Sequence, residues 1–348
     1  MKRVLVTGAG GFIANHLVSY LKEHGHWVRG VDIKPPEFSN SDADDFQILD
    51  LRRWDNCLVA TRKIDWVYAL AADMGGMGFI SANHATILRN NSLINLHTFD
   101  AARHNGVQRY FFTSSACIYP EYLQESPDVT ALKEEDAFPA QPQDAYGWEK
   151  LVAEQLCTHY SEDFYIDTRI VRFHNIFGPL GTWQGGCEKA PAALCRKVAY
   201  AKLTGNPEVE IGGDGEQIRS FCYIDDCVVG MHKLMSSSYF EPLNLGQDRL
   251  VSINELADII AEIAGIDIVK KHVPGPQGVR GRNSDNTRLR EILGWEPQIS
   301  LEAGLAHTYR WIEEQVKSQY GEAFPVNRRL QREQNEGATE NYHHHAIL

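Results

Sequence analysis

RVLVTGAGGFIA, residues 3–14, is the stretch that decides the fold of this chain. A short apolar run meets a cluster of glycines, and apolar residues then recur at helical spacing through Leu17, Val18 and Leu21. This order predicts a strand, a tight turn and a helix. Such glycines let the backbone approach a pyrophosphate, whose charge faces the free N–H groups of the helix. The cofactor contacts predicted here are Gly8, Gly11, Phe12 and Ile13.

Two acidic residues follow the next apolar runs. Asp32 lies near the end of the run 27–33, about twenty residues past the glycines, where a carboxylate can accept hydrogen bonds from an adenosine ribose. A carboxylate there repels a 2′-phosphate, so NAD is expected rather than NADP. The alternative is that Asp32 only caps the strand end. The run 46–49 predicts a third strand, after which Asp50 can reach the adenine.

Alternation of strands and helices continues through the N-terminal half. Residues 66–72 and 109–114 read as strands, with a helical stretch at 83–105 between them. The expected fold class is therefore α/β, a Rossmann-type doubly wound parallel sheet with ligands at the C-terminal ends of its strands. A smaller, discontinuous α/β substrate domain is expected to complete the chain.

Composition excludes several other classes. The 348 residues are 43% hydrophobic and 23% charged, with a formal net charge of −12, which favours solubility and argues against nucleic acid as a partner. No apolar run reaches eighteen residues and the chain enters a strand at once, so neither a membrane span nor a signal peptide is expected, and we expect a cytoplasmic protein. The seven cysteines form no CxxC pair. Free thiols and no metal site are the expectation.

The strand ending near residue 114 leads into candidate catalytic residues. Ser114, Ser115 and Cys117 follow one another there. Tyr146 and Lys150 are four apart, hence on one helix face, where the ammonium can lower the phenol pKa and hold a nicotinamide ribose. A serine hydroxyl would complete the arrangement.

The order of TGxxGxxA, an acidic strand end, a serine turn and YxxxK resembles the extended short-chain dehydrogenase/reductase family that acts on nucleotide sugars. The resemblance covers residues 1 to about 320, and within it several strings are more specifically similar to the GDP-mannose 3,5-epimerases. These strings are AADMGGMGF (71–79), SSACIYP (114–120), PQDAYG (142–147), RFHNI (172–176), EKAPAA (188–193), RSF (219–221) and GVRGRNSDN (278–286).

The resemblance implies a reaction on a GDP-hexose. If Tyr146 takes the proton of the C4 hydroxyl while NAD takes the hydride, the resulting ketone acidifies the hydrogens at C3 and C5. Cys117 can then act as a thiolate, and the resemblance offers Lys189 as the opposed acid. The implied products are GDP-L-galactose and GDP-L-gulose, and inversion at C3, C5 or both stays open. Cys187 departs from the family pattern, where a basic residue is more usual.

The same resemblance supplies substrate contacts and an organisation of the chain. Arg219 and Arg280 are candidates for the diphosphate, since a guanidinium pairs bidentately with phosphate oxygens. The remaining predicted substrate contacts are Gly75, Ser114, Ser115, Cys117, Asn175, Glu188, Lys189, Ala190, Lys197 and Gln217. The expected NAD-binding domain spans 1–175 with a returning segment near 223–249. The expected substrate domain spans 176–222 and 250–320, and its first part holds a hairpin-like turn at 212–215. A polar tail with three histidines, His343 to His345, spans 321–348. A homodimer through helices near 83–106 and 146–160 is implied.

Four other functions match parts of the same sequence. A 4,6-dehydratase needs an acid/base carboxylate where Ala116 and Cys117 stand. A simple 4-epimerase leaves Cys117 and Lys189 idle, and it stays open. A 3,5-epimerase/reductase of GDP-fucose synthesis prefers NADPH and pairs its cysteine with histidine, so Asp32 and Lys189 disfavour it. A silent NAD-binding scaffold has no use for the catalytic set.

Overall fold

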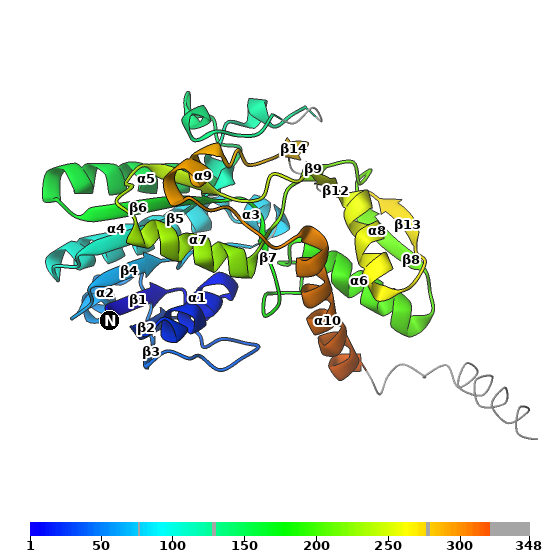
Figure 1. The fold of residues 1–348 in the computed structure, drawn as a ribbon, viewed down its shortest axis with the longest axis horizontal. Coiled ribbons are helices and arrows are strands. Elements are labelled where there is room, and N and C mark those ends of the chain that lie inside the picture. Colours follow the sequence, from blue (N-terminus) through cyan, green and yellow to red (C-terminus); the bar gives the residue numbers. More distant parts are fainter. Residues whose placement is uncertain (76, 127–129, 276–278, 321–348) are drawn as a thin grey trace, which may run out of the picture.

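The computed structural model describes residues 1–320 except 76, 127–129 and 276–278 (Figure 1). The predicted tail 321–348 and His343 to His345 lie outside the described residues. Among these residues the chain forms one large parallel sheet covered by helices, with a smaller group of helices and short strands beside it (Figure 1).

Within the described ranges the large sheet has seven strands, all paired in parallel. In spatial order they are β11 (Pro242–Leu245), β6 (Asp167–Phe173), β5 (Arg109–Ser115), β4 (Trp66–Ala69), β1 (Arg3–Thr7), β2 (Trp27–Asp32) and β3 (Asp45–Ile48). The order reverses between β1 and β4, where ligands bind in doubly wound sheets. The predicted fold class is confirmed.

Helices cover both faces of this sheet because its strands carry apolar residues on both sides. Val4 and Val6 pack with α1 (Phe12–Glu23) and α7 (Ile224–Ser236), whereas Leu5 packs on the opposite face. That opposite face is covered by α2 (Trp54–Thr61), α4 (His84–His104) and α5 (Ala145–Phe164). The layers can be followed in Figure 1.

Strand β4 ends earlier than the apolar run predicts. The N–H groups of Leu70 and Ala71 donate to the Thr7 hydroxyl at 3.1 Å each instead of extending the ladder. A side chain of β1 thus closes β4 at Ala69, so that the following residues leave the sheet beside the glycine turn.

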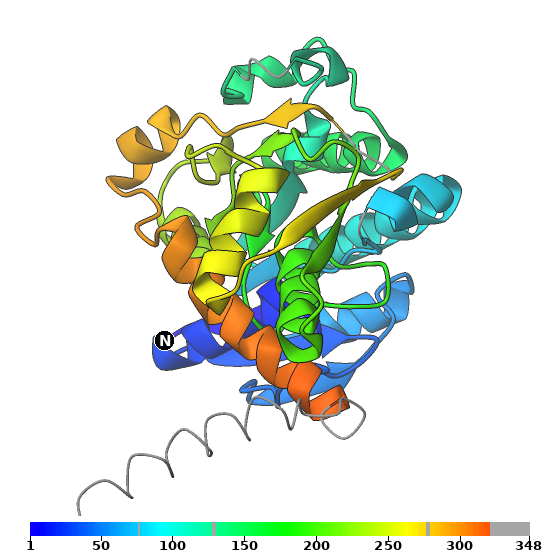
Figure 2. The same cartoon turned by 90° about the vertical axis from the view of Figure 1, so that its right-hand side faces the viewer.

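The second part of the chain is built around three packed helices. α6 (Ala190–Thr204), α8 (Ile253–Ala264) and α10 (Leu301–Tyr320) contact one another and lie side by side in Figure 2. Short strands accompany them: β7 (Ile176–Phe177), β8 (Glu208–Gly212), β9 (Ile218–Arg219), β10 (Cys222–Tyr223), β12 (Val251–Ser252), β13 (Val269–Val273) and β14 (Gly281–Arg282). The remaining short elements are α3 (Met77–Ala82), η1 (Ala116–Ile118), η2 (Glu121–Leu123), η3 (Glu134–Ala137) and α9 (Thr287–Leu293).

The turn at 212–215 does not make the expected hairpin. β8 pairs in parallel with β13, whereas β9 pairs with β12 and β14. The turn therefore joins two different sheets, and the hairpin prediction is wrong, because glycines mark a reversal of the chain without fixing which strands then pair. After it, α7 and β11 return to the large sheet. The boundaries between the two predicted domains stay a proposal.

Candidate functional site

The glycine turn leaves a place for a pyrophosphate at the start of α1. Gly8 has φ +71°, and a Cβ there would lie 2.9 Å from the backbone of Ala71. α1 begins after Gly11 without a side-chain cap, so its first N–H groups are available to an anion. Phe12 and Ile13 form its first turn. The residues fit the phosphates of a dinucleotide.

Asp32 and Asp50 both have protein partners. The Asp32 carboxylate accepts from the Gly10 N–H at 2.9 Å, and a Cβ on Gly10 would lie 2.3 Å from the Lys34 carbonyl oxygen. Asp32 therefore braces the glycine turn, and its contact with a ribose stays a prediction. Asp50 pairs with Arg52 at 2.8 Å, and hydrogen bonds from that side chain lower the pKa of Asp50. Its contact with the adenine also stays a prediction.

Ser115 and Ser114 point to different partners because they alternate along β5. The Ser115 hydroxyl accepts from the Cys117 N–H at 3.1 Å, caps η1, and is hydrogen-bonded to Tyr146. The Ser114 hydroxyl donates to Glu154, a buried residue of α5. Ser114 is thus engaged in the protein interior, and its predicted substrate contact is untested.

Glu154 belongs to a buried ion pair beneath the site. Its carboxylate bonds Arg172 of β6 at 2.7 Å, and the two side chains are only 2% and 3% exposed. Tyr146, Lys150 and Glu154 recur every four residues on α5, so this pair joins the helix face that carries the first two to the centre of the sheet. Sequence spacing alone had not singled out Glu154.

Tyr146 and Lys150 are both buried, with exposed fractions of 6% and 3%. The Lys150 Nζ lies 5.6 Å from the centroid of the Tyr146 ring and 4.9 Å from that of Phe112. Burial raises the pKa of the Tyr146 phenol well above its ordinary value, and Cys117 raises it further, while the bond with Ser115 opposes them. Desolvation of the phenolate therefore dominates in this arrangement, and the expectation that Lys150 lowers this pKa stays a prediction.

α5 approaches Cys117 closely. Asp144 caps the helix by accepting from the Gly147 N–H at 2.8 Å. A Cβ on Gly147 would lie 2.2 Å from the Cys117 carbonyl oxygen, so only glycine lets the helix start pass η1. The sequence Tyr-Gly thus brings Tyr146 and Cys117 together.

Arg282 is a residue of this candidate site that sequence reasoning missed. Its Nη1 lies 3.5 Å from the Cys117 Sγ, and its Nε donates to Gln124 at 2.5 Å. Arg280, the predicted phosphate ligand two residues earlier, instead pairs with Asp214 through two bonds of 2.9 Å. The string 278–286 did point to this segment, but it did not distinguish its two arginines.

Lys189 and Arg219 are electrostatic neighbours of the same thiol. Lys189 is exposed as a residue, yet protein atoms around its ammonium lower its pKa by desolvation; Cys117 raises that pKa and Arg282 lowers it. Burial lowers the pKa of Arg219 to about 9, with a further lowering by Arg282. Among the described residues, none of these three cations pairs with a carboxylate. The site therefore holds positive charge that the protein leaves unneutralised.

Other predicted contacts lie around this centre with partners of their own. Asn175, at φ +47°, donates to the Ser220 carbonyl at 2.9 Å. Gln217 is buried, and its Oε1 has no partner among the described atoms. Ala190 is the first residue of α6, and a Cβ on Gly75 would lie 2.9 Å from Phe79.

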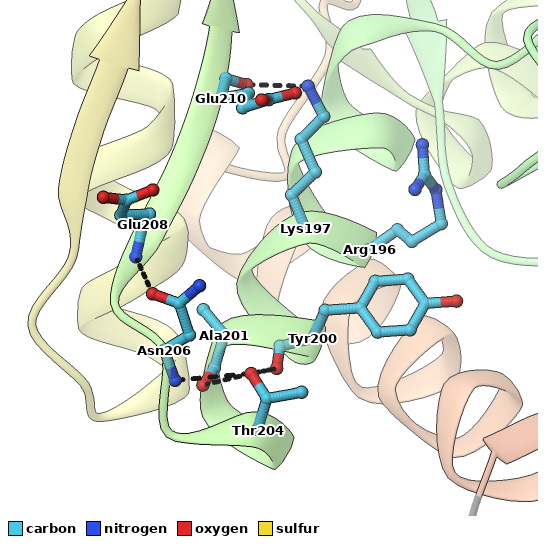
Figure 3. A pocket seen from close by; sticks show the side chains of 8 residues that line it. All are labelled: Arg196, Lys197, Tyr200, Ala201, Thr204, Asn206, Glu208 and Glu210. Atoms are coloured by element: carbon cyan, nitrogen blue, oxygen red, sulfur yellow. Dashed lines mark hydrogen bonds between the residues drawn. The ribbon is translucent and has the colours of Figure 1, made fainter. Parts of the chain in front are cut away.

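A pocket of about 250 Å³ lies between α6 and β8 (Figure 3). The Lys197 Nζ donates to the Glu210 carbonyl at 2.6 Å at one end of it, and Arg196 and Tyr200 line it from the same helix (Figure 3). Glu188 is held by Arg196 at 2.7 Å. Glu188 and Lys197 are thus tied to the protein, and their substrate contacts stay predictions.

Neither a candidate metal site nor a membrane-spanning helix occurs in the described part of the chain. It contains no group of three or more histidine, cysteine or acidic residues that could hold a metal ion. None of the helices described is long and apolar enough to span a bilayer.

Comparisons with known proteins show the family that this chain resembles. Residues 4–246 match the model of the NAD dependent epimerase/dehydratase family. The chain is 52% identical over 319 residues to GDP-mannose 3,5-epimerase 1 of Oryza sativa subsp. indica, covering 91% of this chain and 83% of that protein. It is 28% identical over 321 residues to GDP-L-fucose synthase of Escherichia coli K12, covering 89% and 96%. The UDP-glucose 4-epimerase of Thermotoga maritima, solved with UDP-glucose, superposes with a TM-score of 0.81 at 26% identity, covering 90% and 99%.

Proposed function

This chain belongs to the NAD dependent epimerase/dehydratase family, and we propose that within it the chain acts as a GDP-mannose 3,5-epimerase. It converts GDP-mannose to GDP-L-galactose, and to GDP-L-gulose where C5 alone is inverted. The observation that carries this proposal is the meeting of Cys117 with Lys189 and Arg282 beside Tyr146. A 4-epimerase needs Tyr146 but has no use for a thiol and an amine.

The glycine turn, the start of α1, Asp32 and Lys150 would hold NAD, which when bound would supply a reversible hydride acceptor for the sugar C4. Gly8 and Gly10 leave no space for side chains there, and Asp32 keeps the turn in shape. The Lys150 ammonium lies near the Phe112 and Tyr146 rings, where it can donate to a ribose hydroxyl.

Tyr146 takes the proton of the C4 hydroxyl. Ser115 donates to the phenol oxygen and favours its ionised form, against the burial that disfavours it. Oxidation at C4 gives a ketone, which acidifies the hydrogens at C3 and C5.

Cys117 and Lys189 exchange those protons on opposite faces of the ring. The thiolate removes one proton and leaves an enolate, and the ammonium returns a proton to the other face. Water then takes the proton from the thiol and reprotonates the amine, so that the same pair can serve the second carbon. Arg282 stabilises negative charge on the sulfur, because its guanidinium lies 3.5 Å away. Tyr146 returns its proton to the C4 oxygen when the ketone is reduced.

The unneutralised cations favour a diphosphate. Arg282 lowers the pKa of both Lys189 and Arg219, and none of the three cations has a carboxylate partner within the described ranges. An anion of two phosphates relieves this repulsion. Arg280 can join them only by leaving Asp214.

We also propose a homodimer through α4 and α5. These helices pack together, and their outer surface exposes Leu88 and Leu96 from α4 at 43% each and Trp148 and Val152 from α5 at 44% and 63%. A second copy of the same pair buries this apolar face in a four-helix interface. Val152→Glu should shift the sedimentation of the protein to that of a monomer.

Solvent exchange tests the proposed function. With GDP-mannose and NAD in deuterated water, the protein should place deuterium at C3 and C5. Cys117→Ser should keep C4 oxidation, seen as absorbance of reduced nicotinamide, and lose the label. Unchanged uptake in that variant removes the thiol from the mechanism, consumption of NADPH favours the fucose-type reductase, and no exchange in the wild type favours a silent scaffold.

A further inference from the structure

Lys189 stands on a loop that no regular element supports. The residues before it include Gly185 and Gly186, both exposed and with φ of +92° and +87°. Lys189 is the N-cap of α6, so only its C-terminal side is fixed by the helix. An acid that must face one carbon of a sugar needs a second support.

Arg196 provides that support from inside α6. Its Nη2 bonds Glu188 Oε1 at 2.7 Å, and its Nε donates to the Trp183 carbonyl at 3.0 Å. Glu188 in turn accepts from the Gly186 N–H at 2.7 Å. The Arg196 and Glu188 side chains are 22% and 8% exposed, so water does not replace these bonds easily. Buried Trp183 anchors the far end of the loop.

The position of Arg196 suits a clamp rather than a ligand. Seven residues separate it from Lys189, which is about 10 Å along a helix. Its guanidinium nevertheless reaches back to the residue next to Lys189, and its stem lines the pocket between α6 and β8 (Figure 3). One side chain thus joins that pocket to the acid-bearing loop.

We propose that Arg196 is a positioning residue that fixes Lys189 in register with the sugar, an inference that rests on the proposed function. The two bonds of the clamp need a planar fork, because Nε and Nη2 bond the two ends of the loop at once. A lysine at 196 can bond Glu188 alone, so it can hold only one of the two ends.

Three variants test the clamp in the full-length protein with GDP-mannose and NAD. Arg196→Met should lower deuterium uptake about ten- to hundredfold while C4 oxidation and KM change less than about twofold. Arg196→Lys should recover part of the uptake. Lys202→Met is the matched control, since Lys202 lies on the same helix in a surface pair with Glu313 at 2.9 Å, and it should leave both readouts unchanged.

Equal losses of uptake and C4 oxidation in Arg196→Met, or no loss of either, overturn the positioning role. Amide hydrogen exchange supplies a readout that does not depend on the substrate. The Gly186 amide should exchange faster in Arg196→Met and keep its rate in Lys202→Met; an unchanged rate in Arg196→Met refutes the clamp itself. If wild-type protein shows no exchange on GDP-mannose while the Gly186 amide responds as expected, the proposed function fails and the clamp stands.

Discussion

The two sides of the reaction centre are built in different ways. The tyrosine side, Ser115, Cys117, Tyr146 and Lys150, comes from β5, η1 and α5, and its tyrosine and lysine are buried. The lysine side, Lys189, Arg219 and Arg282, comes from an exposed loop and two-residue strands. The first side is fixed by the sheet, and the second by side-chain hydrogen bonds, among them Arg196 to Glu188 and Arg282 to Gln124. The residues for hydride transfer, on the tyrosine side, are therefore held more rigidly than the lysine that takes part in proton exchange.

Removing the phenol should give the largest effect and break only the tyrosine side. Tyr146→Phe should lower kcat about 10³- to 10⁴-fold, because no other group beside the C4 hydroxyl takes its proton. Phenylalanine fills the same space, so the thermal unfolding midpoint of the variant should equal that of the wild type. Rapid mixing with GDP-mannose should show no reduced nicotinamide, in contrast to Lys189→Met, which should form it and fail later. More than a tenth of wild-type turnover in Tyr146→Phe would assign the base elsewhere.

Stability should separate the supports of the two sides. Glu154→Ala leaves Arg172 buried and unpaired beneath α5, which should cost about 3–5 kcal/mol of unfolding free energy. Glu188→Ala removes the partner of Arg196, which is partly exposed, and should cost less than about 2 kcal/mol. Urea unfolding measures both. A larger loss for Glu188→Ala would mean that the lysine side is held more firmly than the tyrosine side.

The tyrosine side is also the side that sequence predicts. Strand ends of a parallel sheet meet at one edge, so the glycine turn, Ser115, Cys117 and Tyr146 could be brought together from their order alone. No comparable rule predicts which side chains of two different loops will contact each other. The string 278–286 named the segment, yet tertiary contacts decide that Arg282 reaches the Cys117 sulfur while Arg280 reaches Asp214.

Burial is the other quantity that sequence could not supply. Spacing places Lys150 beside Tyr146, but whether the phenol pKa is raised or lowered depends on how completely the protein encloses the ring. The same holds for Ser114, whose neighbour Glu154 lies forty residues away and was not singled out. Pairing of β8 with β13 also depends on distant residues.

Arg280 and Arg282, the two arginines of the string 278–286, should have different effects on the reaction. Arg282→Met should lower deuterium uptake about ten- to hundredfold with a smaller change in KM, because it removes the positive charge beside the sulfur. Arg280→Met tests the predicted phosphate contact, and if Asp214 is its only partner KM should change less than about threefold. A large rise of KM in Arg280→Met alone would restore the choice made from sequence.

The smallest effect expected is on the titration of Lys189. Its pKa lies below the ordinary 10.5 because protein surrounds the ammonium, so the neutral amine forms at a lower pH than on a free lysine, and proton donation by Lys189 should fall off at a correspondingly lower pH. Arg282 lowers this pKa and Cys117 raises it. In ¹³C-labelled protein, with the signal assigned through Lys189→Met, the lysine titration should therefore move to higher pH in Arg282→Met and to lower pH in Cys117→Ser. A titration that does not move in either variant would place Lys189 too far from the Cys117 sulfur to act on the same substrate. Lys189 would then not be the acid, whereas the assignment of Tyr146 as the base would stand.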